Sequence, residues 1–192
     1  MLTLQQKAQE ARKAVLTMIH RAGTSHIGSN FSSIDILTVL FEKLDFKKDK
    51  FICSKGWIAA AVYYFLSEKG LISKEELDTY CKSGSRLIGL TEPGIPGIEF
   101  AGGSMGMGLP AAVGFALAKK LKGEEGTVYC LMSDAELQCG TTWESALIAA
   151  HHNLDNLIVL IDGNGLQAMG KTKEILKVRV PNAYTEIDGH NY

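Results

Sequence analysis

The chain has 192 residues, with 20 lysines and arginines against 21 aspartates and glutamates, so its formal net charge is −1. This length suits one domain with a sizeable core, and we expect a single domain over residues 1–192. The absence of a basic surplus argues against general nucleic-acid binding. No apolar run is long enough for a signal peptide or a membrane span, and the four cysteines form no CxxC pair. We therefore expect a cytoplasmic globular protein with reduced thiols and no membrane segment.

The first part of the chain predicts helices. Residues 4–22 carry apolar side chains at helical spacing, and the pattern ends at Gly23, a favourable C-terminal cap. A second helix is expected over about 32–44, because Ser32 and Ser33 are favourable residues at a helix N-terminus.

A short strand and two helices are expected next. Residues 51–53 are a short apolar run typical of a strand, and 57–69 predict a mostly buried helix. Ser73 followed by Glu76 predicts the capping box of a further short helix. Trp57 is expected to belong to the core or to an interface.

Beyond a long glycine-rich loop over 83–108, short apolar strands alternate with helices. Such a loop inside a domain is usually functional. The helices are expected over 109–121 and 141–152, and the strands over 127–132, 157–162 and, as a weaker pattern, 184–192. This alternation predicts βαβ units and a buried parallel sheet, so we expect a three-layer, doubly wound α/β domain with a mostly parallel sheet.

Two polar side chains follow consecutive strands of this predicted sheet. Asp134 comes after the run TVYCLMS, and Asn164, 30 residues later, comes after LIVLIDG. One right-handed βαβ unit is about this long, so both residues should reach the same edge of the sheet, where open α/β sheets bind ligands. A carboxylate, an amide oxygen and a nearby backbone carbonyl are a donor set that suits Mg²⁺.

The sequence around these residues resembles a known family. The stretch SDAELQCGTTWESALIAAHHNLDNLIVLIDGNG is similar to the thiamine-diphosphate motif of transketolases, a GDG followed about thirty residues later by Asn. RAGTSHIGSNFSSIDILTVLF, ICSKGWIAAAVYYFLSEKG, GSMGMGLPAAVGFALAKKL and IDGHNY resemble further transketolase segments. The resemblance covers nearly the whole chain and implies the diphosphate-binding domain of that family.

The resemblance implies a role for each matching residue. Asp134 and Asn164 would bind a divalent metal, Mg²⁺ or Ca²⁺ or Mn²⁺, through their side chains, and Leu166 would bind it through its carbonyl. Ala135 would lie against the coenzyme diphosphate by its backbone. Gly103 and Met105 would lie beside the aminopyrimidine ring of the coenzyme. His26 would face the substrate as a catalytic residue.

The chain departs from the family pattern at several positions. Trp57 stands where the family has the histidine of its SKGH segment, and Leu90 stands at the position of a second histidine. In the family, both histidines line the channel that handles sugar hydroxyls and, in part, the coenzyme phosphate, so their loss puts a phosphorylated sugar substrate in question. Cys139 replaces a glutamate that couples two active sites across a dimer, and Ser133 replaces the first glycine of GDG.

The resemblance also implies a partner. Transketolases need a second domain that binds the aminopyrimidine, so we expect a split N-terminal subunit, shortened at its C-terminus and active only with a pyrimidine-domain subunit. The expected assembly is a homodimer or a heterotetramer that performs two-carbon ketol transfer on a small-molecule substrate. A non-standard substrate, or a degenerate subunit kept for assembly or regulation, are the alternatives.

Simpler roles exist for individual residues. Asp134 could cap a helix, and Asn164 could be a turn residue. For Cys139 the alternative is a functional one, a nucleophile at a helix start. Residues 106–111, GMGLPA, fit the GxGxxA pattern of nicotinamide-binding folds, but no strong strand precedes them.

Overall fold

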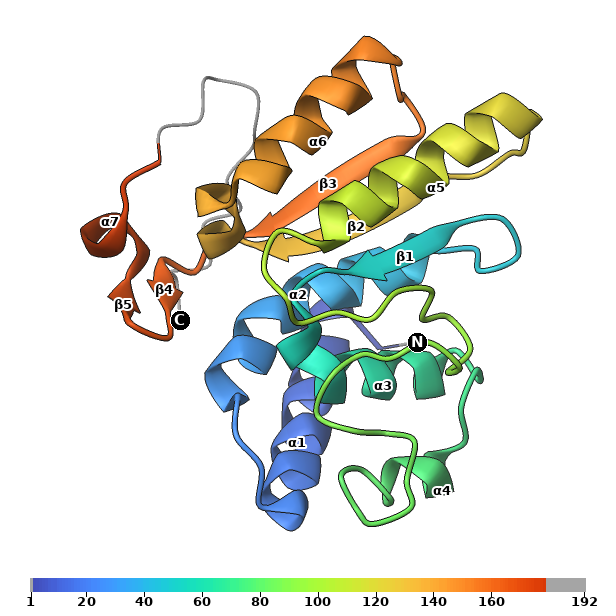
Figure 1. Cartoon of the computed structure of the whole chain (residues 1–192). Coiled ribbons are helices and arrows are strands. Elements are labelled where there is room, and N and C mark those ends of the chain that lie inside the picture. The colour runs from blue at the N-terminus through green and yellow to red at the C-terminus, as the bar shows by residue number, and fades with distance from the viewer. Residues whose placement is uncertain (1, 179–192) are drawn as a thin grey trace. The chain divides into compact units, whose positions relative to one another are not determined.

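The computed structural model describes residues 2–178, which form two compact units (Figure 1). Residues 2–47 and 56–103 form the first, here called the helical unit. Residues 48–55 and 104–178 form the second, the sheet unit. Each unit therefore combines two separate stretches of the sequence.

The helical unit contains three packed helices and two short helical turns. These are α1 (Leu4–Ala22), α2 (Ile27–Lys43), η1 (Gly56–Ile58), α3 (Ala59–Glu68) and α4 (Lys74–Leu77). α1, α2 and α3 pack against one another in pairs. The expected helix over 4–22 is confirmed, with Gly23 in the left-handed conformation at its C-terminal cap. Ser73 caps α4 by accepting a hydrogen bond from the Glu76 amide, as predicted.

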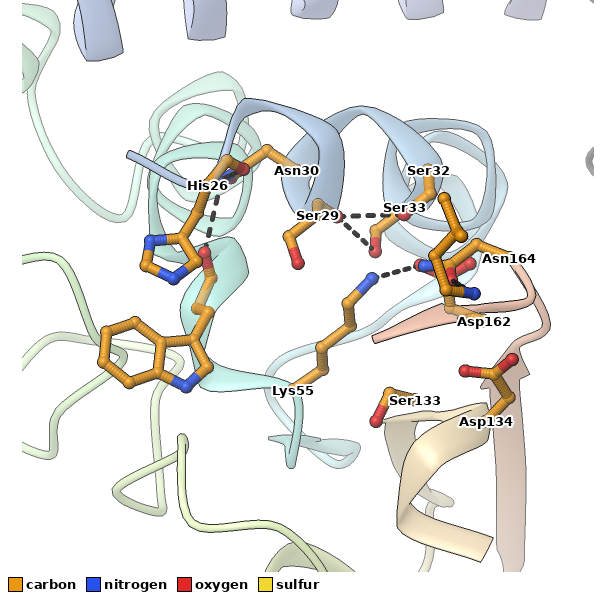
Figure 2. Close-up of polar contacts among 12 residues, drawn as sticks. His26, Ser29, Asn30, Ser32, Ser33, Lys55, Ser133, Asp134, Asp162 and Asn164 are labelled. Atoms are coloured by element: carbon orange, nitrogen blue, oxygen red, sulfur yellow. Dashed lines mark hydrogen bonds and ion pairs between the residues drawn. The ribbon is translucent and has the colours of Figure 1, made fainter. Parts of the chain in front are cut away.

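The second helix begins earlier than the sequence predicts, at Ile27 rather than near Ser32. His26 precedes it in the left-handed conformation, with φ of 73°. The Ser32 and Ser33 hydroxyls both donate to the carbonyl of Ser29 inside the helix (Figure 2). These serines are therefore satisfied by the preceding turn and do not act as caps, which is why their pattern misplaced the helix start.

The sheet unit is built on three parallel strands in the order β1-β2-β3. The strands are β1 (Lys50–Cys53), β2 (Val128–Ser133) and β3 (Leu157–Asp162). Helix α5 (Gly108–Lys122) packs against all three strands and against α6 (Gly140–His151), and both helices lie on the same face of the sheet (Figure 1). The predicted α/β class with a parallel sheet is confirmed, and its strands lie within one residue of the expected positions.

The strands differ in burial. The side chains of Phe51, Ile52 and Cys53 in β1 are at most 3% exposed, and most of β2 is buried as well. β3 is only half-buried, with Ile158 41% exposed, so the expectation of a fully buried sheet is wrong for this strand. In the described part of the chain β3 lies at an edge of the sheet, where it has one strand neighbour.

Short elements follow the main strands. η2 (Asp134–Gln138) follows β2 directly, and β4 (Leu166–Gln167) pairs with β5 (Gly170–Lys171) in an antiparallel ladder after β3. A four-residue helix, α7 (Thr172–Ile175), follows β5. The strand expected over 184–192 lies outside the described residues. Within residues 2–178, the helices are too short or too polar to cross a bilayer.

Candidate functional site

The edge of the sheet formed by the ends of β2 and β3 carries the two residues that the sequence singles out. Ser133 is in register with Asp162, so the two parallel strands end side by side. Asp134 opens η2 immediately after β2, and Asn164 follows β3 by two residues. The βαβ geometry inferred from their spacing is thus confirmed for this part of the chain.

The carboxylate of Asp134 is bound on one side and open on the other. Its Oδ2 accepts a hydrogen bond from the Gly165 amide at 3.0 Å, which ties the start of η2 to the loop after β3. Its Oδ1 is buried and has no hydrogen-bond partner within the described chain. Because a buried carboxylate oxygen without a partner is unfavourable, this atom marks a place where a cation would be stabilising.

The loop after β3 presents further oxygen atoms beside Asp134. Asn164 Oδ1 accepts a hydrogen bond from the Leu166 amide at 2.8 Å, which closes a turn and places the side-chain oxygen beside the backbone of this loop. Gly165, between them, has φ of 72°, a conformation that favours glycine. The side chain of Leu166 is 61% exposed, so any role of this residue at the site falls to its backbone.

This donor set suits a hard divalent cation. A carboxylate oxygen, an amide oxygen and a backbone carbonyl are the protein ligands that Mg²⁺ accepts, with waters and phosphate oxygens completing the octahedron. Among residues 2–178 no group of three or more histidine, cysteine, aspartate or glutamate side chains could hold a metal. The oxygen donors at Asp134 and the Asn164–Leu166 loop therefore fit Mg²⁺ better than a metal that prefers nitrogen or sulfur.

A buried ion pair borders this edge of the sheet, and sequence patterns did not reveal it. Lys55, just after β1, donates to the carboxylate of Asp162 at the end of β3 (Figure 2). The two side chains are only 7% and 5% exposed. The pair thus connects the ends of β1 and β3, the two strands on either side of β2.

Glu136 is a second residue that sequence reasoning missed. Glu136 lies in η2 and is only 1% exposed, and both of its carboxylate oxygens accept hydrogen bonds. Oε2 accepts hydrogen bonds from the amide and hydroxyl of Ser133, at 2.7 and 3.2 Å. Oε1 accepts from the Ser54 hydroxyl and from the Gly106 amide, the latter at 3.0 Å. The reciprocal Ser133–Glu136 bonds form a capping box. The spacing of a serine and a glutamate three residues later is the sequence pattern that could have identified Glu136.

The remaining predicted residues are divided between the two units. In the sheet unit, Ala135 is 3% exposed directly after Asp134, and Met105 is 57% exposed in the segment before α5. Gly103 is the last residue of the helical unit, with φ of 119°. A Cβ atom on Gly103 would lie 2.7 Å from a methyl group of Leu90, so this position has no room for a side chain.

His26, also in the helical unit, stacks on Trp57. The ring centroids are 4.6 Å apart and the planes are inclined by 18°. Trp57 is 43% exposed, so of the two expected places the core is wrong, and an interface stays a prediction. The buried Asn30 side chain donates to the carbonyls of His26 and Trp57, at 2.9 and 3.2 Å (Figure 2). Its side-chain oxygen accepts a hydrogen bond from the Ala61 amide. One side chain thus joins the backbones of the two residues whose rings stack and ties both to the start of α3.

Cys139 is a poor candidate for a nucleophile. It precedes α6, but burial and, secondarily, the nearby Glu136 carboxylate raise the pKa of its thiol. A raised pKa lowers the fraction of reactive thiolate at neutral pH. The described structure therefore gives no support to covalent chemistry at this cysteine.

Comparison with known proteins places the chain within a family. The model of the family described as "Transketolase, thiamine diphosphate binding domain" matches residues 4–190. An apulose-4-phosphate transketolase subunit from Phocaeicola vulgatus is 35% identical over 185 residues, covering 92% of this chain and 66% of that protein. 6-Deoxy-6-sulfo-D-fructose transketolase subunit SqwG from a Clostridium species is 33% identical, covering 99% of this chain and 76% of that protein. The chain thus spans about two thirds to three quarters of the length of these relatives.

A solved structure agrees with this assignment. Transketolase from Campylobacter jejuni superposes with a TM-score of 0.87 at 30% sequence identity, over 93% of this chain and 31% of the longer one. The fold of this chain is therefore shared with one part of a much longer enzyme.

Proposed function

The chain belongs to the transketolase family, whose thiamine diphosphate-binding domain it matches over nearly its whole length, and we propose that it binds the coenzyme diphosphate through Mg²⁺. In this proposal it acts with a separate pyrimidine-domain subunit, as a homodimer or heterotetramer, in two-carbon ketol transfer. The relatives that are named as individual transketolase subunits support a divided enzyme. The free cysteines of the described chain are consistent with a cytoplasmic location.

One observation carries the metal site: Asp134 Oδ1 is buried and has no hydrogen-bond partner among residues 2–178. We assign this oxygen, the Asn164 side-chain oxygen and the Leu166 carbonyl as the protein ligands of the metal, with Ala135 offering its backbone to the diphosphate. The Gly165 amide already fixes the other Asp134 oxygen, so the carboxylate is oriented before any ion binds. When bound, the coenzyme supplies the thiazolium group at which a two-carbon unit is transferred.

Calorimetry of the purified chain with Mg²⁺ and thiamine diphosphate tests the site. Asp134→Asn removes the charged ligand but keeps the shape, and we expect the coenzyme affinity to fall about 100-fold or more, by analogy with the loss of metal-site partners. Asp155→Asn is the matched control, because that side chain is 89% exposed in a surface ion pair. Unchanged affinity in Asp134→Asn, or equal losses in both variants, would reject Asp134 as the ligand.

A second candidate keeps the coenzyme and changes the substrate. Trp57 replaces a family histidine and is stacked on His26, so at this point the helical unit offers an indole surface in place of a proton donor. With His26 as the substrate-facing catalytic residue, this change favours a substrate other than the usual phosphosugars.

Substrate turnover distinguishes the two candidates. With the partner subunit present, we expect little turnover of xylulose 5-phosphate plus ribose 5-phosphate by the natural chain, and more by Trp57→His. Efficient turnover by the natural chain would eliminate the second candidate. Tyr64→His, at another aromatic residue of the same helical unit, is the control for the introduced imidazole.

A further inference from the structure

The segment Ser104–Gly108 of the sheet unit is tied to the end of β2 through one buried carboxylate. Glu136 Oε1 accepts one hydrogen bond from the Gly106 amide, at 3.0 Å, and another from the Ser54 hydroxyl. The same hydroxyl oxygen of Ser54 accepts the Gly108 amide at 3.1 Å. One oxygen of Glu136 therefore organises two amides of the segment, the first directly and the second through Ser54.

The segment is also closely packed at the same point. The carbonyl of Gly106 accepts a hydrogen bond from the Thr141 hydroxyl at 2.7 Å. A Cβ atom on Gly106 would lie 2.6 Å from both Cys139 Cβ and Thr141 Oγ1, and one on Gly108 would lie 2.2 Å from Ser54 Cβ. The backbone of Gly106 and Gly108 is thus fixed by contacts on both sides, while the side chains of Met105 and Met107 remain 57% and 47% exposed.

The other oxygen of Glu136 holds the beginning of η2. Through the Ser133 amide and hydroxyl it fixes the turn that carries Asp134 and Ala135. Because both oxygens belong to one carboxylate, the Ser104–Gly108 segment and the Asp134 turn keep a fixed mutual position. Buried charged hydrogen bonds are strong, and a carboxylate offers four acceptor sites, which an amide cannot reproduce.

We propose that Glu136 is a positioning residue that holds the Ser104–Gly108 segment against the coenzyme ring while the Asp134 turn holds the diphosphate. This inference rests on the proposed coenzyme site. It assigns to Glu136, acting through Gly106 and Ser54, the correct spacing between the two ends of the coenzyme. Loss of that link should impair binding of the whole coenzyme more than binding of its diphosphate alone.

Two probes separate these contributions: Mg²⁺ with thiamine diphosphate, and Mg²⁺ with inorganic pyrophosphate. In Glu136→Gln the amide group cannot accept all four donors, so we expect affinity for thiamine diphosphate to fall at least tenfold. Affinity for pyrophosphate should change less than threefold, because the remaining amide oxygen has two lone pairs and can still accept both Ser133 donors, which fix the Asp134 turn. Ser54→Ala cuts only the link to Gly108 and one donor to Glu136, and should show the same difference on a smaller scale.

Ser145→Ala is the matched control, since its buried hydroxyl donates to a carbonyl within its own helix. If Glu136→Gln proves too unstable by thermal unfolding, Ser54→Ala decides the question. Equal losses for both probes, or no loss for either in folded variants, would overturn the positioning role. If the natural chain binds pyrophosphate and not thiamine diphosphate, or binds neither, the proposed coenzyme function fails first and this inference fails with it.

Discussion

At the scale of single residues, a substitution at Gly106 tests how tightly the Ser104–Gly108 segment is packed. Gly106 has φ of 75°, and an added Cβ would overlap Cys139 and Thr141. Gly106→Ala should therefore lower the free energy of unfolding by about 2–4 kcal/mol, from backbone strain and overpacking together. Urea denaturation measures this loss. Gly114→Ala in α5, where a Cβ meets nothing within 4 Å, should instead stabilise by about 0.5–1 kcal/mol.

Tyr80 makes the free energy of unfolding depend on pH in the alkaline range. Burial, with a smaller contribution from the neighbouring Cys81, raises the pKa of Tyr80 to about 12. In the unfolded chain a phenol ionises near pH 10, so above that pH the unfolded state loses a proton that the folded state keeps. The stabilisation is complete below about pH 10 and is lost as the pH rises towards 12, by up to about 1.4 kcal/mol per pH unit.

Denaturation of the natural chain and of Tyr80→Phe at pH 9 and pH 11 measures this contribution. The natural chain should lose more stability than the variant between the two pH values, because phenylalanine has no proton to release. Equal losses would contradict the assignment of the effect to this side chain.

At the scale of elements, the ion pair between Lys55 and Asp162 connects the ends of β1 and β3. Removing one partner takes away the opposite charge that stabilises the other buried ion, so Lys55→Met should cost about 3–5 kcal/mol of unfolding free energy. The double variant Lys55→Met with Asp162→Leu should recover much of that loss. If the double variant is as unstable as the sum of the two single variants, the charges do not stabilise each other.

Local patterns predicted the elements well and their long-range contacts poorly. The strands 127–132 and 157–162, the helix between them and the placement of Asp134 and Asn164 follow from periodicity and the length of one βαβ unit. The start of α2 was misplaced because hydroxyl groups that bond backward resemble caps. Glu136 meets Ser54 across 82 residues and Lys55 meets Asp162 across 107, separations at which no sequence period links the partners.

At the scale of the whole molecule, β1 belongs to the sheet unit although it lies between two stretches of the helical unit. A fragment of residues 104–192 would therefore lack β1, which pairs with β2 over four residues and buries Phe51 and Ile52. We expect this fragment not to fold cooperatively in thermal unfolding followed by circular dichroism. A cooperative transition like that of the full chain would show that β1 is dispensable.

A divalent cation at Asp134 is tested most directly by diffraction from crystals grown with Mn²⁺ and thiamine diphosphate. Anomalous scattering should place one Mn²⁺ about 2.0–2.3 Å from Asp134 Oδ1, the Asn164 side-chain oxygen and the Leu166 carbonyl, with diphosphate oxygens completing its shell. Coenzyme bound with its metal elsewhere, or an Asp134 carboxylate that contacts no ion in the loaded crystal, would contradict the site.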